Sequence, residues 1–327
     1  MIVTRIPLRV SLFGGGSDRS HFYRHTPGKV LNFSINRYMF VIGRKQVEPI
    51  KNRFLIKWAE INAADHLDDL EHPILRSALS HFEFNDPLEV ITFSDVDANT
   101  GLGSSSAFAV GISLLLSTYQ QKRLTKSEIA STASNIEINI AGRNIGKQDH
   151  YGCTYGGINI FEFNPDHTVI NTPIILSSDI RTEIFNSFRL VYVGGGRDAA
   201  AILDGQKLDT ENSRDNIQSS IDLVDDGANA LLKSDIRELG YLLAEAWACK
   251  KKFGDSVSND VIDKIYKRGI EAGAVGGKLL GAGGGGYILF VVPKDAELFF
   301  DKAMGDLIAS TIDLDQVGAR LTYYDEA

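Results

Sequence analysis

The stretch PLEVITFSDVDANTGLGSSSAFAVGISLLLSTYQQ, residues 87–121, predicts a strand, a glycine turn and a helix in direct succession. Residues 87–96 are rich in β-branched and aromatic side chains, which is typical of a strand. Apolar residues recur at helical spacing from Phe108 to Tyr119. The glycines between them let backbone N–H groups converge, and a helix that starts near Ser105 would point its positive dipole end at an anion. We therefore expect a phosphate loop here.

The serines of this loop distinguish two interpretations. A serine N-cap on a core helix is common, but one serine would satisfy it. Three serines, Ser104 to Ser106, follow two glycines. An anion cradle is the better explanation, with hydroxyl groups that could also bind magnesium, although such a cradle could serve any phosphate.

The remaining chain alternates strands and helices in both halves, which indicates an α+β protein of two domains. The pattern weakens around 177–187, so we place the boundary there and expect domains at 1–182 and 183–327. Strands are expected at 4–13, 30–45, 87–96, 188–195, 287–292 and 319–324, and a hairpin at 156–174. Helices are expected at 72–82, 108–121, 126–142, 212–233, 236–253, 257–272 and 294–308.

Composition excludes several classes of protein. Lys plus Arg total 34 and Asp plus Glu total 42, so the formal net charge of −8 argues against nucleic-acid or anionic-membrane binding. The chain has 2 cysteines, which suits a cytoplasmic protein without a disulfide framework or Cys-rich zinc site. The uncharged segment 98–121 is interrupted by Gly, Ser and Thr, so we expect a buried helix rather than a membrane span. The oligomeric state stays open, a homo-oligomer included.

A second glycine-rich segment is KLLGAGGGGYILF, residues 278–290. Gly281, Gly283 and Gly286 satisfy the letters of a dinucleotide fingerprint, which needs a strand before the glycines and a helix after them. We expect the reverse order, a helical stretch and then a strand, so a Rossmann site is excluded. Four consecutive glycines more plausibly let a backbone approach a ligand closely.

Several charged residues stand at positions that could carry chemistry. Asp18 follows three glycines and could simply belong to a surface turn. Asp149 lies in a loop, and a single Asp in a loop does not by itself indicate a function. Glu137 shares a helical face with small and apolar residues, where a carboxylate is costly unless a Lys, an Arg or magnesium pairs with it. His150 is most simply a packing histidine. Arg197 could clamp an anion or cap a loop.

Taken in order, RIPLRVSLFGGGSD, GLGSSSA and GGKLLGAGGGG resemble the motifs of the GHMP kinase superfamily (galactokinase, homoserine kinase, mevalonate kinase and phosphomevalonate kinase). The resemblance spans residues 5–286. The spacing from Glu137 to Asp149 is similar to that between magnesium ligand and catalytic aspartate in its sugar kinases. Together with GKQDHYGCTYGGINIFEF, the motifs look most like the branch that phosphorylates D-glycero-D-manno-heptose phosphates. Gly15 and Gly16 stand where galactokinases have a Glu-His pair, and His150 stands where heptose kinases usually have Gln.

The resemblance implies a fold and an activity. The N-terminal domain would be similar to domain 2 of ribosomal protein S5, with a left-handed βαβ unit, and the C-terminal domain would be ferredoxin-like. The active site would lie between them. The implied reaction transfers the γ-phosphate of ATP, with Mg²⁺, to the anomeric hydroxyl of a heptose 7-phosphate, for nucleotide-activated heptose and surface glycans. A fucose or galactose kinase, and a mevalonate- or homoserine-type kinase, are the alternatives.

The resemblance also implies roles for individual residues. Asp149 would activate the sugar hydroxyl, while Arg9 keeps Asp149 ionised and neutralises charge on the moving phosphoryl group. Ser105 and Glu137 would bind Mg²⁺. The ATP phosphates would be held by Gly101, Leu102, Gly103, Ser104, Ser105, Ser106, Gly283 and Gly284. The sugar would contact Gly16, Ser17 and Asp18, and its phosphate would be anchored by Arg197 and Lys147.

Overall fold

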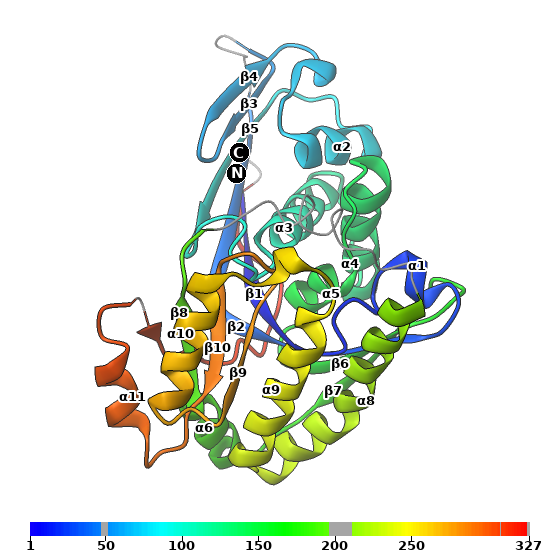
Figure 1. The fold of residues 1–327 in the computed structure, drawn as a ribbon. Helices are drawn as coiled ribbons and strands as arrows, with labels where there is room; N and C mark the ends of the chain where they lie inside the picture. Colours follow the sequence, from blue (N-terminus) through cyan, green and yellow to red (C-terminus); the bar gives the residue numbers. More distant parts are fainter. Residues whose placement is uncertain (47–51, 196–210, 308, 326–327) are drawn as a thin grey trace.

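A computed structural model describes residues 1–46, 52–195, 211–307 and 309–325, which form two sheets joined by helices (Figure 1). The strands are β1 (Ile2–Phe13), β2 (Gly28–Lys45), β3 (Phe54–Lys57), β4 (Ile61–Ala64), β5 (Leu88–Ser94), β6 (Ile158–Phe163), β7 (Val169–Ile174), β8 (Phe188–Tyr192), β9 (Gly276–Leu279), β10 (Tyr287–Val291), β11 (Ala309–Ser310) and β12 (Arg320–Tyr324). The α-helices are α1 (Ser20–Tyr23), α2 (Pro73–His81), α3 (Ser104–Tyr119), α4 (Lys126–Ser134), α5 (Gln148–Tyr155), α6 (Ser178–Ser187), α8 (Glu211–Lys233), α9 (Ile236–Lys251), α10 (Asp260–Glu271) and α11 (Glu297–Ala303).

The large sheet is organised around the long strand β2. One edge of β2 pairs with β1, and the other edge pairs with β6 at its start and with β5 at its end. Pro7 lies opposite Tyr38 but Leu8 lies opposite Ile35, so β2 carries extra residues at this point and bends. Both β5 and β6 run antiparallel to β2 and hence parallel to each other, so the chain between them crosses over through α3, α4 and α5. The handedness of this crossover stays a prediction.

Helix α3 follows directly on the loop predicted to bind phosphate, and it is buried on nearly every side from Ser106 to Ser113. A helix that is apolar all round needs partners on all faces. Strands β1 and β2 pack on one side, and α2, α4 and α5 also contact it. This packing fixes the direction in which the start of α3 points. None of the helices in the described ranges has the length and hydropathy of a membrane span.

The small sheet has the strand order β11-β8-β10-β9, with all neighbours antiparallel. In order of appearance this is 4-1-3-2, the ferredoxin-like arrangement that the family resemblance implies, so the α+β fold class is confirmed. Helix α8 contacts β1 and β2, while α9 contacts β9 and β10, and the two helices pack together (Figure 1). The boundary expected between 182 and 183 falls inside α6 and stays a prediction.

The element expected before the second glycine run is wrong. The segment before the second glycine run is a strand, β9, rather than a helical stretch. Its residues Gly276 and Gly277 give no β-branched or aromatic signal, yet a side chain could not fit there, since a Cβ at Gly276 would lie 1.9 Å from Gly240 O of α9. The glycines therefore connect β9 and β10 as a hairpin. A strand follows them as expected, where a dinucleotide fingerprint requires a helix, so a Rossmann site is still excluded.

Candidate active site

The two glycine segments meet backbone to backbone. A Cβ built on Gly101 would lie 2.7 Å from Leu280 O, and one on Gly281 would lie 2.3 Å from Gly101 Cα. At Gly286, where φ is +99°, a Cβ would approach Thr100 O to 2.3 Å. Only glycine permits contacts this close. The hairpin of the small sheet thus packs directly against the phosphate loop of the large one.

A cleft opens beside this contact. Its walls come from both halves of the chain: the strand β1 and the loop after it, the start of α3, the start of α5, and the hairpin between β9 and β10. Of the residues predicted for the site, the structure brings nine to the cleft: Arg9, Gly16, Asp18, Gly101, Gly103, Ser104, Ser105, Asp149 and Gly283.

The phosphate loop ends at Gly103, which caps α3 with φ at 79°. Ser104 and Ser105 line the cleft at the start of the helix, where free backbone N–H groups and the helix dipole favour an anion. Leu102 and Ser106 do not line it. Leu102 is completely buried, and its carbonyl accepts from the Arg9 backbone N–H at 3.1 Å. Leu102 thus anchors the loop, and the contact of Leu102 and Ser106 with the ATP phosphates stays a prediction.

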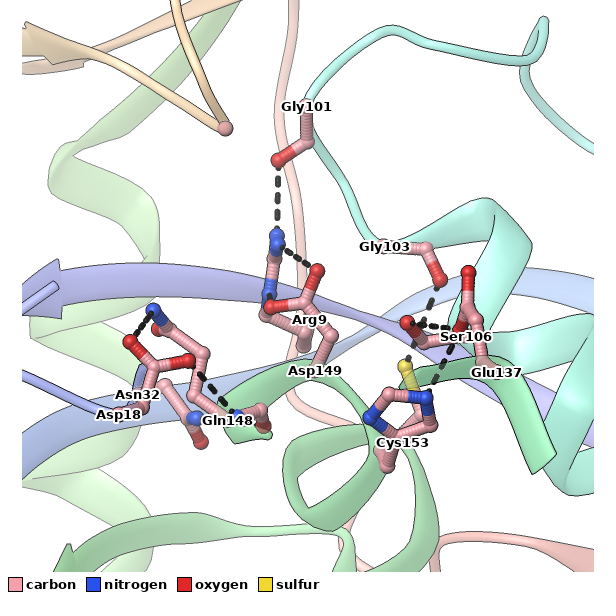
Figure 2. Close-up of polar contacts among 12 residues, drawn as sticks. Arg9, Asp18, Asn32, Gly101, Gly103, Ser106, Glu137, Gln148, Asp149 and Cys153 are labelled. Atoms are coloured by element: carbon pink, nitrogen blue, oxygen red, sulfur yellow. Dashed lines mark hydrogen bonds and ion pairs between the residues drawn. The ribbon is translucent and has the colours of Figure 1, made fainter. Parts of the chain in front are cut away.

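Arg9 and Asp149 form a bidentate ion pair (Figure 2). Arg9 Nε donates to Asp149 Oδ1 at 2.7 Å and Nη2 donates to Oδ2 at 2.5 Å. The remaining Arg9 nitrogen, Nη1, donates to Gly101 O at 2.7 Å. The carboxylate is therefore held in one orientation beside the phosphate loop.

Asp149 lies on a helix, which corrects the expected loop. It belongs to the first turn of α5, where the dipole favours a carboxylate. The helix was missed because Gly146 and Gly152 lower the helical propensity of this segment. Tertiary packing overrides that propensity: Tyr151 and Cys153 are buried, and Tyr151 stacks edge-on against Phe161 with ring centroids 5.7 Å apart.

Glu137 lies completely buried behind the phosphate loop, on the π-helical turn Asn135–Ile140. Its Oε2 accepts from Ser106 Oγ and from His150 Nε2, both at 2.8 Å. Arg143 Nε lies 3.8 Å from Oε1. Burial acts to raise the pKa of Glu137, but His150 and the hydroxyls of Ser105 and Ser106 outweigh it and hold the pKa below its usual value. A histidine, which the sequence suggested to be a packing residue, is thus the main partner of this carboxylate.

The other end of the cleft presents a second buried carboxylate, Asp18. Oδ1 accepts from Gly16 N at 3.1 Å and from Gln148 Nε2 at 3.0 Å, and Oδ2 accepts from Gln148 N at 3.0 Å (Figure 2). Burial is the largest influence and raises the pKa of Asp18, with the charge of Asp149 adding to it. The carboxylate is fixed in place and faces the cleft, so it can accept hydrogen bonds from a ligand.

Some predicted residues lie elsewhere. Ser17 is buried and bonds to Gly14 O at 2.7 Å, so it shapes the turn. Lys147 Nζ lies 4.8 Å from the centre of the Tyr23 ring and does not line the cleft. The N–H of Gly284 donates to Val257 O at 3.0 Å, on a different face of the hairpin. Arg197 is outside the described residues.

The residues of the cleft that the sequence did not predict include two lysines, Lys250 on α9 and Lys278 on β9. Both are almost fully buried, with 8% and 5% exposure. A signal for each was present. Lys250 shares a helical face with Leu243, Ala246 and Trp247, and Lys278 stands alone in a run of small and apolar residues, the same kind of evidence that singled out Glu137.

A phosphoryl transfer needs a cradle for the donor phosphates, a carboxylate at the point of transfer and space for an acceptor on the far side. Groups of these kinds line the cleft: Ser104 and Ser105 at the start of α3, Asp149 and Asp18. This is the arrangement expected of a kinase of small molecules.

Comparison with known proteins gives the family. The sequence family described as GHMP kinases N terminal domain matches residues 72–157, and that described as GHMP kinases C terminal matches 228–304. The D-glycero-alpha-D-manno-heptose 7-phosphate kinase of Campylobacter jejuni is 31% identical over 315 residues, covering 93% of each chain. The chain belongs to the GHMP kinase family and is an ATP-dependent kinase, which confirms the resemblance seen in its motifs.

More distant relatives share the same architecture. A mevalonate kinase from Saccharolobus solfataricus is 24% identical over 97% of this chain and 98% of its own. The crystal structure of a D-glycero-D-manno-heptose 1-phosphate kinase from Bacteroides thetaiotaomicron superimposes with a TM-score of 0.82 at 24% identity, over 100% of both chains. At this level of identity the structural match establishes the fold.

Proposed function

We propose that this GHMP kinase transfers the γ-phosphate of ATP to the anomeric hydroxyl of a heptose 7-phosphate. The observation that carries the proposal is the position of the Arg9–Asp149 pair, between the phosphate loop and the Asp18 carboxylate, in a chain that is 31% identical to a heptose 7-phosphate kinase. A role in supplying nucleotide-activated heptose follows from the same similarity.

The acceptor end of the cleft favours a polyol. Asp18 can only accept hydrogen bonds when ionised, and Gln148 beside it can donate and accept. Sugar hydroxyls match this pattern because each can donate to a carboxylate. Among sugars, Gly15 and Gly16 leave this wall without the Glu-His pair of galactokinases.

In this reaction Asp149 acts as the base. An acceptor hydroxyl placed beside its carboxylate donates its proton to one oxygen while Arg9 keeps both oxygens in position. Arg9 also places positive charge next to the phosphate loop, where charge develops on the transferred group. The backbone amides at the start of α3 hold the donor phosphates. Positioning and electrostatics, which dominate phosphoryl transfer, are thus supplied by the chain's own groups.

Magnesium fits the residues behind the loop. Glu137 Oε1 is buried without a hydrogen-bond partner, while Ser105, whose hydroxyl helps to lower the pKa of the same carboxylate, faces the cleft. The described residues contain no group of three or more His, Cys, Asp or Glu side chains suited to a metal. Mg²⁺ needs only one or two carboxylates because it takes further ligands from water and phosphates. We propose Glu137 and Ser105 as its protein ligands, where Mg²⁺ would neutralise phosphate charge.

The test is an ATP-consumption assay of the purified chain against heptose 7-phosphate, free heptose, fucose, galactose and mevalonate, with the product identified by ³¹P NMR. We expect the highest kcat/KM with heptose 7-phosphate and a new anomeric phosphate. A higher kcat/KM for fucose or galactose would show that the enzyme is a sugar kinase with an acceptor other than heptose 7-phosphate. A preference for mevalonate would reject a sugar acceptor altogether.

A further inference from the structure

Lys250 and Lys278 both line the wall of the cleft formed by α9 and β9, and the charge of Lys278 acts on Lys250. Lys250 Nζ donates to Leu279 O at 2.7 Å and to Gly281 O at 2.5 Å. Lys278 Nζ donates to Leu12 O at 2.6 Å and to Ser11 O at 3.3 Å. Each ammonium has three protons, so each has one left after these bonds.

The charge of this pair is not balanced within the protein. In the parts of the chain that the structure describes, neither ammonium has a carboxylate partner, and Lys278 and Arg9 act on Lys250 as like charges. Arg9 is itself paired with Asp149. Burial of a charge is unfavourable unless an opposite charge compensates it. Burial, with the neighbouring Arg9, accordingly lowers the pKa of Lys278 to about 7.

Hydrogen bonds to backbone carbonyls do not by themselves require a lysine. The bonds of Lys250 hold the hairpin, and those of Lys278 join β9 to β1. A neutral donor such as Gln could make such bonds without burying a charge. Both lysines also line the open cleft next to the phosphate loop. Convergence of two desolvated cations on a cleft is the pattern expected of an anion site.

We propose that Lys250 and Lys278 form a phosphate-binding site on the C-terminal wall of the cleft, which takes a phosphate group of one of the two substrates. The assignment deepens the proposed function and rests on it, since a sugar that already carries a phosphate needs a basic anchor. Lys147, predicted for that anchor, lies outside the cleft. The phosphate has two potential sources, the ester on the sugar and the γ-phosphate of ATP.

The experiment compares the unmodified chain with Lys250→Gln and Lys278→Gln, in which an amide can still bond the carbonyls but the charge is gone. Lys251→Gln is the matched control, because Lys251 is the next residue on α9 and is exposed outside the cleft. Inorganic phosphate is titrated calorimetrically with and without a saturating, non-hydrolysable ATP analogue and Mg²⁺. Turnover is then measured with heptose 7-phosphate and with free heptose.

If the site holds the sugar phosphate, the unmodified chain binds inorganic phosphate with the analogue in place. Each cleft variant then loses about 10- to 100-fold in phosphate affinity, as expected for a charge-assisted bond. KM for heptose 7-phosphate rises by a similar factor, while free heptose and the Lys251→Gln chain are unaffected. If the site holds the γ-phosphate, the analogue displaces inorganic phosphate, the variants bind the analogue more weakly, and both sugars lose turnover equally.

Unchanged affinity for phosphate and for the analogue in both variants would overturn the proposal and leave the lysines structural. Should a variant fail to fold by circular dichroism, a crystal structure of the unmodified chain with phosphate decides, since the site requires a phosphate oxygen within hydrogen-bond distance of both Nζ atoms. The calorimetric titration tests the lysine site without turnover. If the chain does not phosphorylate heptose 7-phosphate, the proposed acceptor is wrong, but the titration still decides whether the lysines bind phosphate.

Discussion

The role of Asp149 can be tested by a single substitution, because asparagine keeps the shape of the side chain but cannot act as a base. In Asp149→Asn the base is lost, and we expect kcat to fall by about 10²- to 10⁴-fold, the usual contribution of a general base. Nucleotide affinity should survive, since the bond from Arg9 to Gly101 O does not involve Asp149. A coupled ATPase assay and calorimetric titration of an ATP analogue measure the two effects. Asp226→Asn, at an exposed position of α8, is the control, and full activity in Asp149→Asn would refute the assignment.

Glu137 offers a second test at the scale of one side chain. Glu137→Gln removes the charge that a magnesium ion would need while the side chain keeps its length. If Glu137 binds Mg²⁺, nucleotide affinity measured with Mg²⁺ should fall about tenfold or more, whereas affinity measured in EDTA should not change. An unchanged dependence on Mg²⁺ would show that the carboxylate serves only as a partner of His150 and Ser106.

The sequence predicted these two carboxylates but not the lysines, for a physical reason. A carboxylate near a segment rich in glycine and serine suggests a metal and phosphate chemistry. A carboxylate on an apolar helical face, such as Glu137, must be paired with a cation or a metal. Lys250 lies in a run of three lysines, and only the tertiary fold decides which of them is buried. The partnership of Glu137 with His150 was also invisible, because it depends on packing α5 against the turn at 135–140.

Among the elements, the hairpin between β9 and β10 makes a specific prediction. In Gly286→Ala the new Cβ would clash with Thr100 O at a φ of +99°, so the phosphate loop must move. We expect a loss of about 1–3 kcal/mol in stability from the backbone strain and a raised KM for ATP.

Gly142→Ala separates the two effects of that substitution. Gly142 has a φ of +70°, but a Cβ added there would meet nothing within 4 Å, so the strain is present without the contact. It should destabilise the chain and leave KM for ATP unchanged. Equal KM values for ATP in both variants would mean that the contact between the loops does not shape the nucleotide site.

The elements that periodicity identified, such as α3, β5 and the hairpin β6–β7, carry strong apolar patterns. The missed ones do not. Strand β9 begins with two glycines, α5 contains one, and the hairpin β3–β4 consists of two strands of 4 residues each. Their conformation is set by neighbours such as α9, so no local pattern could reveal them.

At the scale of the molecule, Lys278 makes stability depend on pH. Its pKa is about 7 in the folded chain against 10.5 ordinarily, so between these values the unfolded chain binds more protons than the folded one. Stability therefore rises with pH through this range, by at most about 1.4 kcal/mol per unit. This contribution of Lys278 to stability is lost as pH falls through its folded-state pKa of about 7. Arg9, Lys250 and Cys249 are the titratable or charged groups that face Lys278.

Denaturant unfolding between pH 6.5 and 9.5 checks this prediction. The unmodified chain should gain free energy of unfolding relative to Lys278→Gln as pH rises, because the variant lacks the titrating group. Parallel pH profiles for the two chains would show that Lys278 keeps an ordinary pKa in the folded state.

The overall fold class was predictable because motifs that lie far apart in the chain, from residue 5 to 286, occur in the right order. The way the halves are joined was not. β12 returns from the C-terminal end to pair with β1, and α8 with α9 fills the space between the sheets. Both features depend on contacts across hundreds of residues, which local sequence does not encode.

The bond from Arg9 Nη1 to Gly101 O joins the proposed base, Asp149, to the proposed nucleotide loop through a single guanidinium. Any shift of that loop when ATP arrives is transmitted to the carboxylate that receives the acceptor. Thermodynamic linkage makes such an effect mutual, so the factor by which nucleotide changes acceptor affinity equals the factor in the other direction. The two substrates are therefore expected to affect each other's binding by the same factor.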